Sequence, residues 1–254
     1  MKKYGILFCG YNSEEYVEKS LSSFLNKDNF VISAVSVPFL EYKDQEPFED
    51  ETTNILRRYL DEGKIHYLVD FPKFIKEAEA RDLALDYLFT EGVDYFWIVD
   101  ADEIYSEKDI KNICEFVEQS KEDWFKISLK NFVFDTETYL QEPFCPPRIF
   151  KTQSKNKFSH PRFIWDNDVI YSDSNSNETL HYTMLPNICI PQDVAWVDHY
   201  SWMNDNIGKR KVQYQQGHFG HCSFKWNEEK KRLEFDEEYF EKTKEPIPKV
   251  IRIT

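Results

Sequence analysis

Glycine is scarce in this chain, with 7 residues among 254. Neither a GxGxxG pattern nor a GxxxxGKS/T pattern occurs in the sequence. The loops that wrap phosphate groups in those two enzyme classes depend on glycine, because only glycine lets the backbone approach the phosphates closely. The shortage therefore argues against a Rossmann-type dehydrogenase and against a P-loop enzyme.

Cysteine pairs and long hydrophobic runs are also missing. The five cysteines are odd in number, widely spaced and form no CxxC pair, which favours reduced thiols. The apolar run behind the basic start ends at Gly10, which is too short for a signal peptide. No segment approaches the roughly 18 apolar residues of a membrane span. We therefore expect a cytoplasmic protein without an integral membrane segment.

Positive charge is in deficit, with 32 Lys and Arg against 46 Asp and Glu and a net charge of −14. Binding to nucleic acid or to an anionic membrane depends on Lys and Arg that replace counterions at phosphates, so this balance opposes both. An acidic chain can still bind an anionic nucleotide where a metal ion bridges the two. The other interpretation is simply a soluble acidic surface.

The chain is nevertheless rich in core-forming residues, with 41% hydrophobic and 17% aromatic content. Its length suits one elaborated domain over residues 1–254. Short apolar stretches alternate with segments of helical periodicity, which predicts an α/β fold. The expected strands are 4–9, 30–39, 65–69 and 95–99. One helix is expected directly after residue 12, and three more at 52–60, 73–90 and 106–120, with Gly63 ending the helix at 52–60.

The acidic cluster after residue 99 is the most informative stretch. Residues 95–99 are apolar and predict a strand buried on both faces. Asp100 and Asp102 would point to one side at the carboxyl end of this strand, where open α/β sheets bind ligands. Two crowded carboxylates are unfavourable unless a cation neutralises them, and oxygen ligands suit Mg²⁺ or Mn²⁺. The alternative is a chance acidic turn, and Glu103, on the opposite side, is expected to be structural.

A second candidate lies at the end of the first strand. Asn12 can cap a helix whose N3 residue is Glu15, in a capping-box-like arrangement. Such a helix start leaves backbone N–H groups that could bind a phosphate, although strand-turn-helix units of this kind are also purely structural.

Two further polar residues follow the same pattern. Asp70 comes after strand 65–69, where it would lie beside the end of the first strand and accept from a nucleotide base, or only cap a turn. Arg81 lies off the apolar stripe of its helix and offers planar donors for a phosphate. An ion pair of Arg81 with Glu77 or Asp82 is the simpler interpretation.

The order of these motifs resembles the donor half of family 2 glycosyltransferases with the GT-A fold. The resemblance is carried by Tyr-Asn-Ser-Glu-Glu at 11–15, Ala-Arg-Asp-Leu-Ala-Leu at 80–85 and Asp-Ala-Asp-Glu at 100–103, and it covers about the first 105 residues. One signature of that family, Asp-Asp-Gly-Ser after the second strand, is missing, because this chain continues there as Val-Pro-Phe-Leu-Glu at 37–41.

The resemblance implies a mostly parallel central sheet flanked by helices. It also implies a nucleotide-sugar donor half at about 1–105, an irregular α+β acceptor half at about 106–225 and C-terminal helices at about 226–254.

The resemblance further implies residue roles. Asp102 would bind a divalent cation, Mn²⁺ or Mg²⁺, and Asp100 would contact the ribose or the metal. Asp70 would meet the base, Arg81 would lie near the diphosphate, and Tyr11 would contact the donor.

The second half of the chain offers a third metal ligand. The apolar run that begins at 194 predicts a strand with His199 at its end. Imidazole suits Mn²⁺ beside carboxylates, although a lone histidine is more often structural. The His-Tyr pair followed by Lys-Arg-Lys at 209–211 resembles the C-terminal part of such transferases, which implies that His199 completes the metal shell and that Lys211 neutralises the diphosphate.

The acceptor site is expected in the polar, aromatic region at about 154–191. The resemblance implies inversion by a single displacement, and retention is the alternative. An inverting transferase needs a general base near the acceptor hydroxyl, and Asp166, Asp168 and Glu178 are the candidates. Alternation at 125–130 predicts one half-exposed strand.

The tail from 227 to 244 is dense in Glu and Lys and predicts a solvent-facing helix. This helix would pack back on the domain or mediate self-association into a homo-oligomer.

The leading hypothesis is therefore a metal-dependent glycosyltransferase that uses a nucleotide-diphosphate sugar and a glycan, lipid-linked or protein acceptor. One alternative is a nucleotidyltransferase, although the first strand lacks the Gly-rich basic loop usual there. Another is a non-catalytic carbohydrate-binding module of the same fold.

Overall fold

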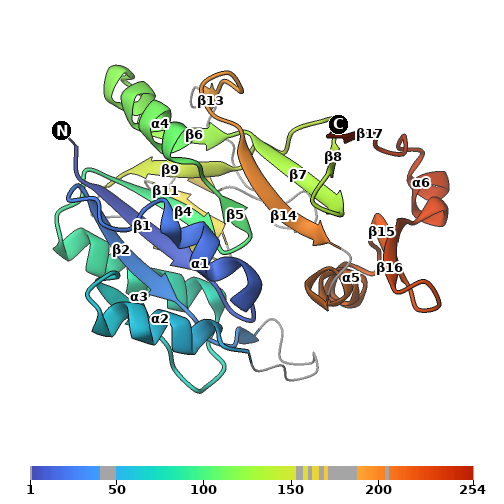
Figure 1. The fold of residues 1–254 in the computed structure, drawn as a ribbon, viewed down its shortest axis with the longest axis horizontal. Coiled ribbons are helices and arrows are strands. Elements are labelled where there is room, and N and C mark those ends of the chain that lie inside the picture. The colour runs from blue at the N-terminus through green and yellow to red at the C-terminus, as the bar shows by residue number, and fades with distance from the viewer. Residues whose placement is uncertain are drawn as a thin grey trace.

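The structure is a computed structural model that describes residues 2–40, 50–152, 157–159, 162–165, 169–170, 188–203 and 206–253. Two larger sheets lie side by side in it (Figure 1). The first carries most of the helices, and the second leads to the C-terminal elements.

The first sheet has seven strands, and its centre is parallel. β1, β2, β3 and β4 run parallel to one another, whereas β9 runs antiparallel to β4 and to β6. This sheet confirms the predicted α/β class. The order is β13-β6-β9-β4-β1-β2-β3, with bounds Ile188–Ile190, Trp124–Ile127, Pro147–Lys151, Tyr95–Asp100, Tyr4–Cys9, Phe30–Val35 and Tyr67–Val69.

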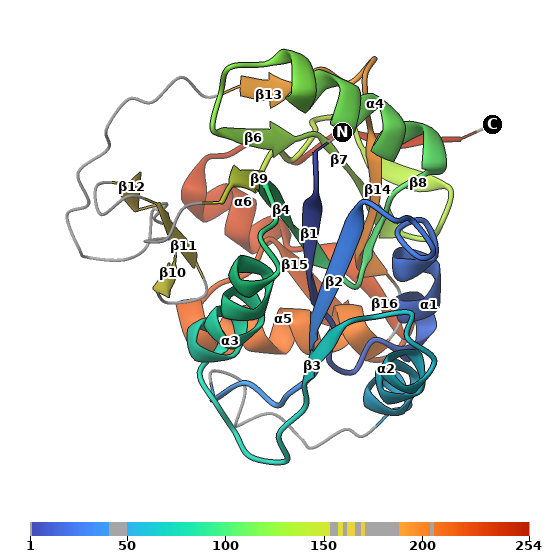
Figure 2. The same ribbon diagram turned by 90° about the vertical axis from the view of Figure 1, so that its left-hand side faces the viewer.

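Both faces of this sheet are covered, which explains why β1, β2 and β4 are apolar almost throughout. Alternate side chains of β1 enter two different clusters, with Ile6 in one and Leu7 in the other. Helices α1, α2 and α4 pack on the Ile6 side and α3 packs on the Leu7 side (Figure 2). These four helices are Glu14–Ser22, Thr52–Asp61, Glu107–Gln119 and Glu77–Thr90.

Local interactions set the helix ends. The capping box of α4 is present, with the Ser106 hydroxyl accepting from the Asp109 N–H at 3.0 Å. Gly63 follows α2 in the left-handed region, with φ of 69°, as predicted. The helix expected at 73–90 begins only at Glu77, because Ile75 pairs with Phe39 in an isolated β-bridge.

The capping role predicted for Asn12 is wrong. Asn12 adopts a left-handed conformation, with φ of 54°, and α1 begins after Ser13. The first N–H groups already have partners, since Ser13 N donates to Thr52 Oγ1 at 2.7 Å and Glu14 N donates to Asp50 Oδ2 at 3.0 Å. The helix start therefore leaves neither of these two N–H groups for a phosphate.

The second sheet has five strands and splits a segment that the sequence pattern joins. The strand expected at 125–130 ends at Ile127 as β6, and the chain crosses into β7 of the second sheet beyond Ser128. The order is β17-β8-β7-β14-β5, with bounds Val250–Arg252, Thr138–Leu140, Leu129–Phe134, Val197–Met203 and Glu103–Ile104.

The helix predicted at 227–244 is wrong over most of its length. The antiparallel hairpin of β15 (Phe224–Asn227) and β16 (Arg232–Phe235) occupies its first part, and only α6 (Glu237–Thr243) is helical. Phe224 and Leu233 are buried with Val212 of α5 (Asn206–Phe219), so the alternating strand pattern is stabilised by packing on a distant helix.

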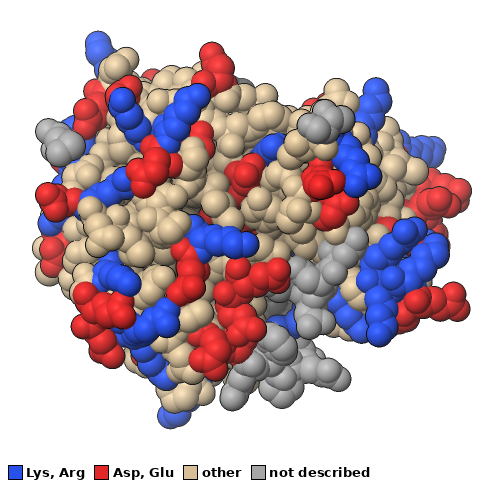
Figure 3. Space-filling view, in the orientation of Figure 1, with Lys and Arg blue, Asp and Glu red and all other residues tan. Residues whose placement is uncertain are grey.

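Three short strands form a separate antiparallel sheet within the region expected to be irregular. They are β10 (Lys157–Ser159), β11 (Arg162–Trp165) and β12 (Val169–Ile170). Among the helices that the structure describes, none is long and apolar enough to cross a membrane. Acidic and basic side chains are intermixed over the face shown in Figure 3.

Candidate functional site

The site forms where the carboxyl end of β4 meets the second sheet. Directly after β4, the short strand β5 pairs antiparallel with β14, and Tyr200 N donates to the backbone oxygen of Asp102 at 2.9 Å. This pairing brings His199 Nε2 to 3.4 Å from Asp102 Oδ2. Two residues that are 97 positions apart in the sequence therefore face each other.

Asp102 is ionised in this setting. Burial by itself would raise the pKa of Asp102, but His199, Lys211 and Arg148 outweigh burial and hold the pKa below its usual range. The carboxylate is 21% exposed, so a ligand can still reach it. A charged carboxylate beside an imidazole nitrogen is a donor set that suits Mn²⁺.

His199 is held on its other side by Asn131 of β7. His199 Nδ1 contacts Asn131 Oδ1, and the two residues are direct neighbours in the parallel pairing of β14 with β7. His199 is 8% exposed, so few orientations of its ring are open to it. The ring is thus fixed between Asn131 and Asp102.

The carboxylate of Asp100 is engaged by two arginines. Arg81 Nη2 lies 3.2 Å from Asp100 Oδ1, and Arg148 Nη2 lies 2.8 Å from Asp100 Oδ2. Burial alone would raise the pKa of Asp100, but the two arginines lower it below its ordinary value. Arg81 also pairs with Glu77 of its own helix at 2.6 Å, as the simpler interpretation expected. The same guanidinium thus binds a carboxylate of the helix and a carboxylate at the end of β4.

Glu103 points away from Asp102 into the core, in agreement with its expected structural role. Its side chain is fully buried, accepts from Arg148 Nε at 2.9 Å, and accepts from the Tyr105 hydroxyl at 3.1 Å. Arg148 therefore bridges two carboxylates, Asp100 and Glu103.

Helix α5 brings positive charge to the site. Lys211 is close enough to lower the pKa of Asp102, and its Nζ lies 5.0 Å from the ring centre of Trp202. Burial lowers the pKa of the neighbouring Arg210, and Tyr11 and Asp50 act in the opposite direction, so Arg210 lies near the end of β1. Lys211 and Tyr11 were both predicted to bind the donor; Lys211 acts on Asp102 at the end of β4, and Tyr11 acts on Arg210 beyond the end of β1.

Asp70 lies farther from this cluster than the sequence pattern suggested. It follows β3, and β2 lies between β3 and β1, so Asp70 does not flank the end of β1. Its carboxylate accepts from Arg57 Nε at 2.6 Å. The three candidates for a general base, Asp166, Asp168 and Glu178, lie outside the described residues.

The described residues fit a divalent cation that shares its shell with a substrate. Across the described ranges, no group of three or more His, Cys, Asp and Glu side chains is placed to hold a metal ion by itself. Asp102 and His199 supply one oxygen and one nitrogen, and Mg²⁺ is commonly held by one or two carboxylates together with substrate phosphates. The pair therefore suits a cation that binds together with a diphosphate.

Two contributors to the site were not predicted from the sequence. Asn131 meets His199 only through a strand pairing across 68 positions, for which the local sequence carries no signal. Arg148 was given no role from the sequence, and the available signal for a buried ion pair was its place directly before the apolar Ile149 and Phe150 of a strand.

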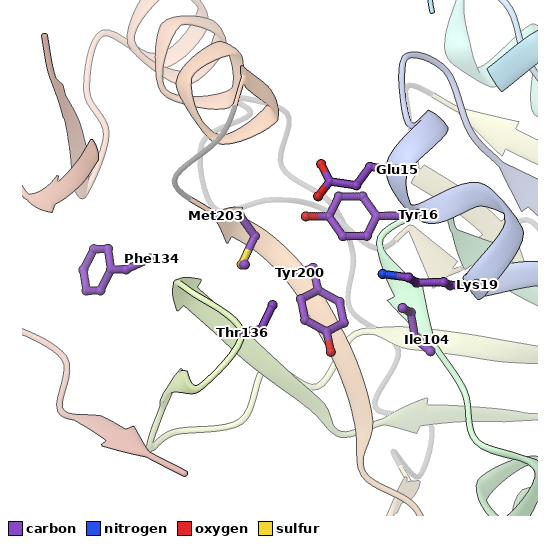
Figure 4. A pocket seen from close by; sticks show the side chains of 8 residues that line it. All are labelled: Glu15, Tyr16, Lys19, Ile104, Phe134, Thr136, Tyr200 and Met203. Carbon is purple, nitrogen blue, oxygen red and sulfur yellow. The ribbon is translucent and has the colours of Figure 1, made fainter. Parts of the chain in front are cut away.

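A separate cavity of about 230 Å³ lies between α1 and β14 (Figure 4). Tyr16 and Tyr200 stack there with ring centres 5.7 Å apart, and Glu15 and Lys19 of α1 also line the cavity. Successive residues of a strand point to opposite faces, so Tyr200 lies on the other side of the sheet from His199. The cavity is therefore not part of the cluster around Asp102.

Solved structures of other proteins are similar to part of the chain. The crystal structure of S. aureus TarS matches 59% of this chain and 28% of its own length, with 18% identity and a TM-score of 0.41. TarS 1-349 in complex with UDP-GlcNAc matches 51% of this chain and 35% of its own, with 21% identity and a TM-score of 0.38.

The mannosyltransferase PcManGT from Pyrobaculum calidifontis, in complex with GDP-Man and Mn²⁺, matches 59% of this chain and 44% of its own, with 15% identity and a TM-score of 0.37. The matched part of the chain thus spans less than half the length of each of these proteins. No family model matches the sequence, and no curated protein matches it.

Proposed function

We propose that this chain is a metal-dependent glycosyltransferase of the GT-A type, acting on a nucleotide-diphosphate sugar. The observation that carries the proposal is the Asp102–His199 pair at the carboxyl end of a parallel strand, with Lys211 beside it. Ligands of open α/β sheets bind at such strand ends. A cation between one carboxylate and one imidazole needs further oxygen ligands, and a diphosphate supplies them.

The side chains of this cluster have separate roles in the proposed reaction. Asp102 and His199 would hold the cation, which when bound polarises the diphosphate and stabilises its charge as it leaves. Lys211, which is close enough to lower the pKa of Asp102, would offset negative charge that develops on the same phosphates. Asp100 keeps Arg81 and Arg148 in place and so would contact the nucleotide less directly than the motif suggested.

Other parts of the proposal depend on the sequence pattern. Residues 1–105 would form the donor half and 106–225 the acceptor half of one domain, working in the cytoplasm. Transfer would invert the anomeric centre, with Asp166, Asp168 or Glu178 as the general base. A glycan, a lipid-linked sugar or a protein would be the acceptor.

The first test is turnover in the presence of Mn²⁺. We expect slow Mn²⁺-dependent hydrolysis of at least one donor in a panel that includes UDP-GlcNAc and GDP-mannose. Turnover of nucleoside triphosphates but not of nucleotide sugars would indicate a nucleotidyltransferase instead. If the protein neither turns over nor binds a nucleotide diphosphate with metal, a carbohydrate-binding module is the better interpretation.

The second test is the variant Asp102→Ala. We expect it to weaken Mn²⁺-dependent binding of UDP or GDP by at least about tenfold. Even the loss of a residue that only orients a metal ligand lowers metal affinity by about 10- to 100-fold, and Asp102 would be a ligand itself. His199→Ala should show a smaller loss. Calorimetry measures both, and circular dichroism checks the fold.

Asp61→Ala, which removes an exposed carboxylate at the end of α2, is the matched control and should bind as the wild type does. Unchanged affinity in Asp102→Ala would show that the site is assigned to the wrong residues.

A further inference from the structure

The contact between Asn131 and His199 decides which ring nitrogen of the histidine can face the site. The amide of Asn131 is oriented with Oδ1 toward His199 Nδ1, and a carbonyl oxygen only accepts hydrogen bonds. This orientation requires the hydrogen of a neutral His199 to be on Nδ1. In this neutral tautomer the other nitrogen, Nε2, carries a lone pair and points toward Asp102 at 3.4 Å. The lowering of the Asp102 pKa by His199 belongs to the protonated ring, which carries a hydrogen on both nitrogens.

The backbone fixes this arrangement. β14 lies between β7 and β5, and His199 is paired with Asn131 on one side and with Glu103 on the other. Glu103 is engaged by Arg148 and Tyr105, so it does not offer His199 a competing acceptor. Asn131 is itself half-buried in a strand whose neighbours Phe132 and Val133 are buried.

Nε2 and Asp102 Oδ2 then both offer lone pairs to the space between them, and a cation bound there would be held by both atoms. We propose that Asn131 is a positioning residue that holds His199 as the Nδ1–H tautomer, so that Nε2 and Asp102 together form a cation site. This inference depends on the proposed function for the cation, but the tautomer itself does not depend on it.

The tautomer is measured directly by ¹⁵N NMR of the metal-free protein, at a pH where the imidazole is neutral. We expect an Nδ1–H signal for His199 in the wild type. Asn131→Asp keeps an acceptor oxygen at this position and should retain the same tautomer. Asn131→Leu removes the acceptor and should give a mixture of tautomers.

Affinity for Mn²⁺ alone provides the second readout. Partners that orient metal ligands are worth about 10- to 100-fold in metal affinity, so Asn131→Leu should lose at least about tenfold. Asn131→Asp should bind no more weakly than the wild type. Asn54→Leu, on the exposed face of α2, is the control and should match the wild type.

An Nε2–H signal in the wild type, or a change of tautomer in Asn131→Asp, would overturn the inference, because the amide would then donate to Nδ1. Asn131→Leu with unchanged tautomer and unchanged Mn²⁺ affinity would overturn it as well. If Asn131→Leu does not fold, the Asn131→Asp variant still decides the tautomer. A wild type that shows Nδ1–H but binds no Mn²⁺ contradicts the proposed metal site and leaves the positioning contact intact.

Discussion

Arg148 is the cation that neutralises the buried carboxylates next to the site. Its guanidinium contacts Glu103, which is fully buried, and Asp100, which is half-buried. Burial raises the pKa of Glu103, and Arg148 acts against that shift. Loss of the arginine would leave a carboxyl group without its cation in the core, which is among the most destabilising changes in proteins.

We therefore predict that Arg148→Met lowers the free energy of unfolding by about 3–5 kcal/mol, the usual cost of removing one partner of a buried ion pair. Urea titration measures this loss. The double variant Arg148→Met with Glu103→Gln should recover part of it, because the unpaired charge is gone. Equal losses in the single and the double variant would show that Arg148 acts by packing and not by pairing.

At the scale of single elements, Gly208 shows how closely α5 approaches β14. A Cβ atom at this position would lie 2.1 Å from the backbone oxygen of Met203, a contact that only a backbone shift can relieve. Helix α5 also carries Lys211, so a shift there would move a charge that acts on Asp102.

Gly208→Ala is expected to cost at least about 2 kcal/mol of stability, within the range for overpacked interiors, and to weaken diphosphate binding. The control is Gly5→Ala, whose Cβ would meet the end of the Leu88 side chain at 2.9 Å, an atom that can move. Thermal unfolding and calorimetry with UDP and Mn²⁺ measure the two effects. A smaller stability loss at Gly208 than at Gly5 would contradict the close approach.

The sequence predicts well those helices and strands whose formation depends on residues adjacent in the chain. The apolar run of β4 and the Ser106 cap of α4 are visible in a few neighbouring residues. The break at Ser128 is not, because the alternation of apolar residues continues across it while the strand changes sheets. The hairpin of β15 and β16 was not predicted, because the many Glu and Lys residues of this segment suggested an exposed helix. Its few apolar side chains favour strands only because they pack on α5, which the local sequence does not show.

The same distinction holds for the site. Asp102 and His199 were identified as separate strand-end residues, and the structure brings them together. Asn131, the partner of His199, could not be identified, because a strand register between distant segments is set by tertiary packing.

At the scale of the whole molecule, the site joins two sheets. Asp102 follows a strand of the seven-stranded sheet, whereas His199 belongs to the five-stranded sheet. An unfolded chain would not hold these two residues together, so a cation bound by both stabilises the native state by mass action.

Mn²⁺ at about 100 times its dissociation constant should add about 2.7 kcal/mol to the free energy of unfolding. For a chain of this size we expect a rise in Tm of roughly 5–10 °C, reversed by a chelator. The net charge of −14 also attracts cations to the surface without a specific site. Asp102→Ala separates the two effects, because it changes the net charge by one and removes the specific ligand. Scanning calorimetry measures the Tm shift that Mn²⁺ causes in each protein. If the shift in Asp102→Ala equals the shift in the wild type, the stabilisation comes from the acidic surface and not from the site.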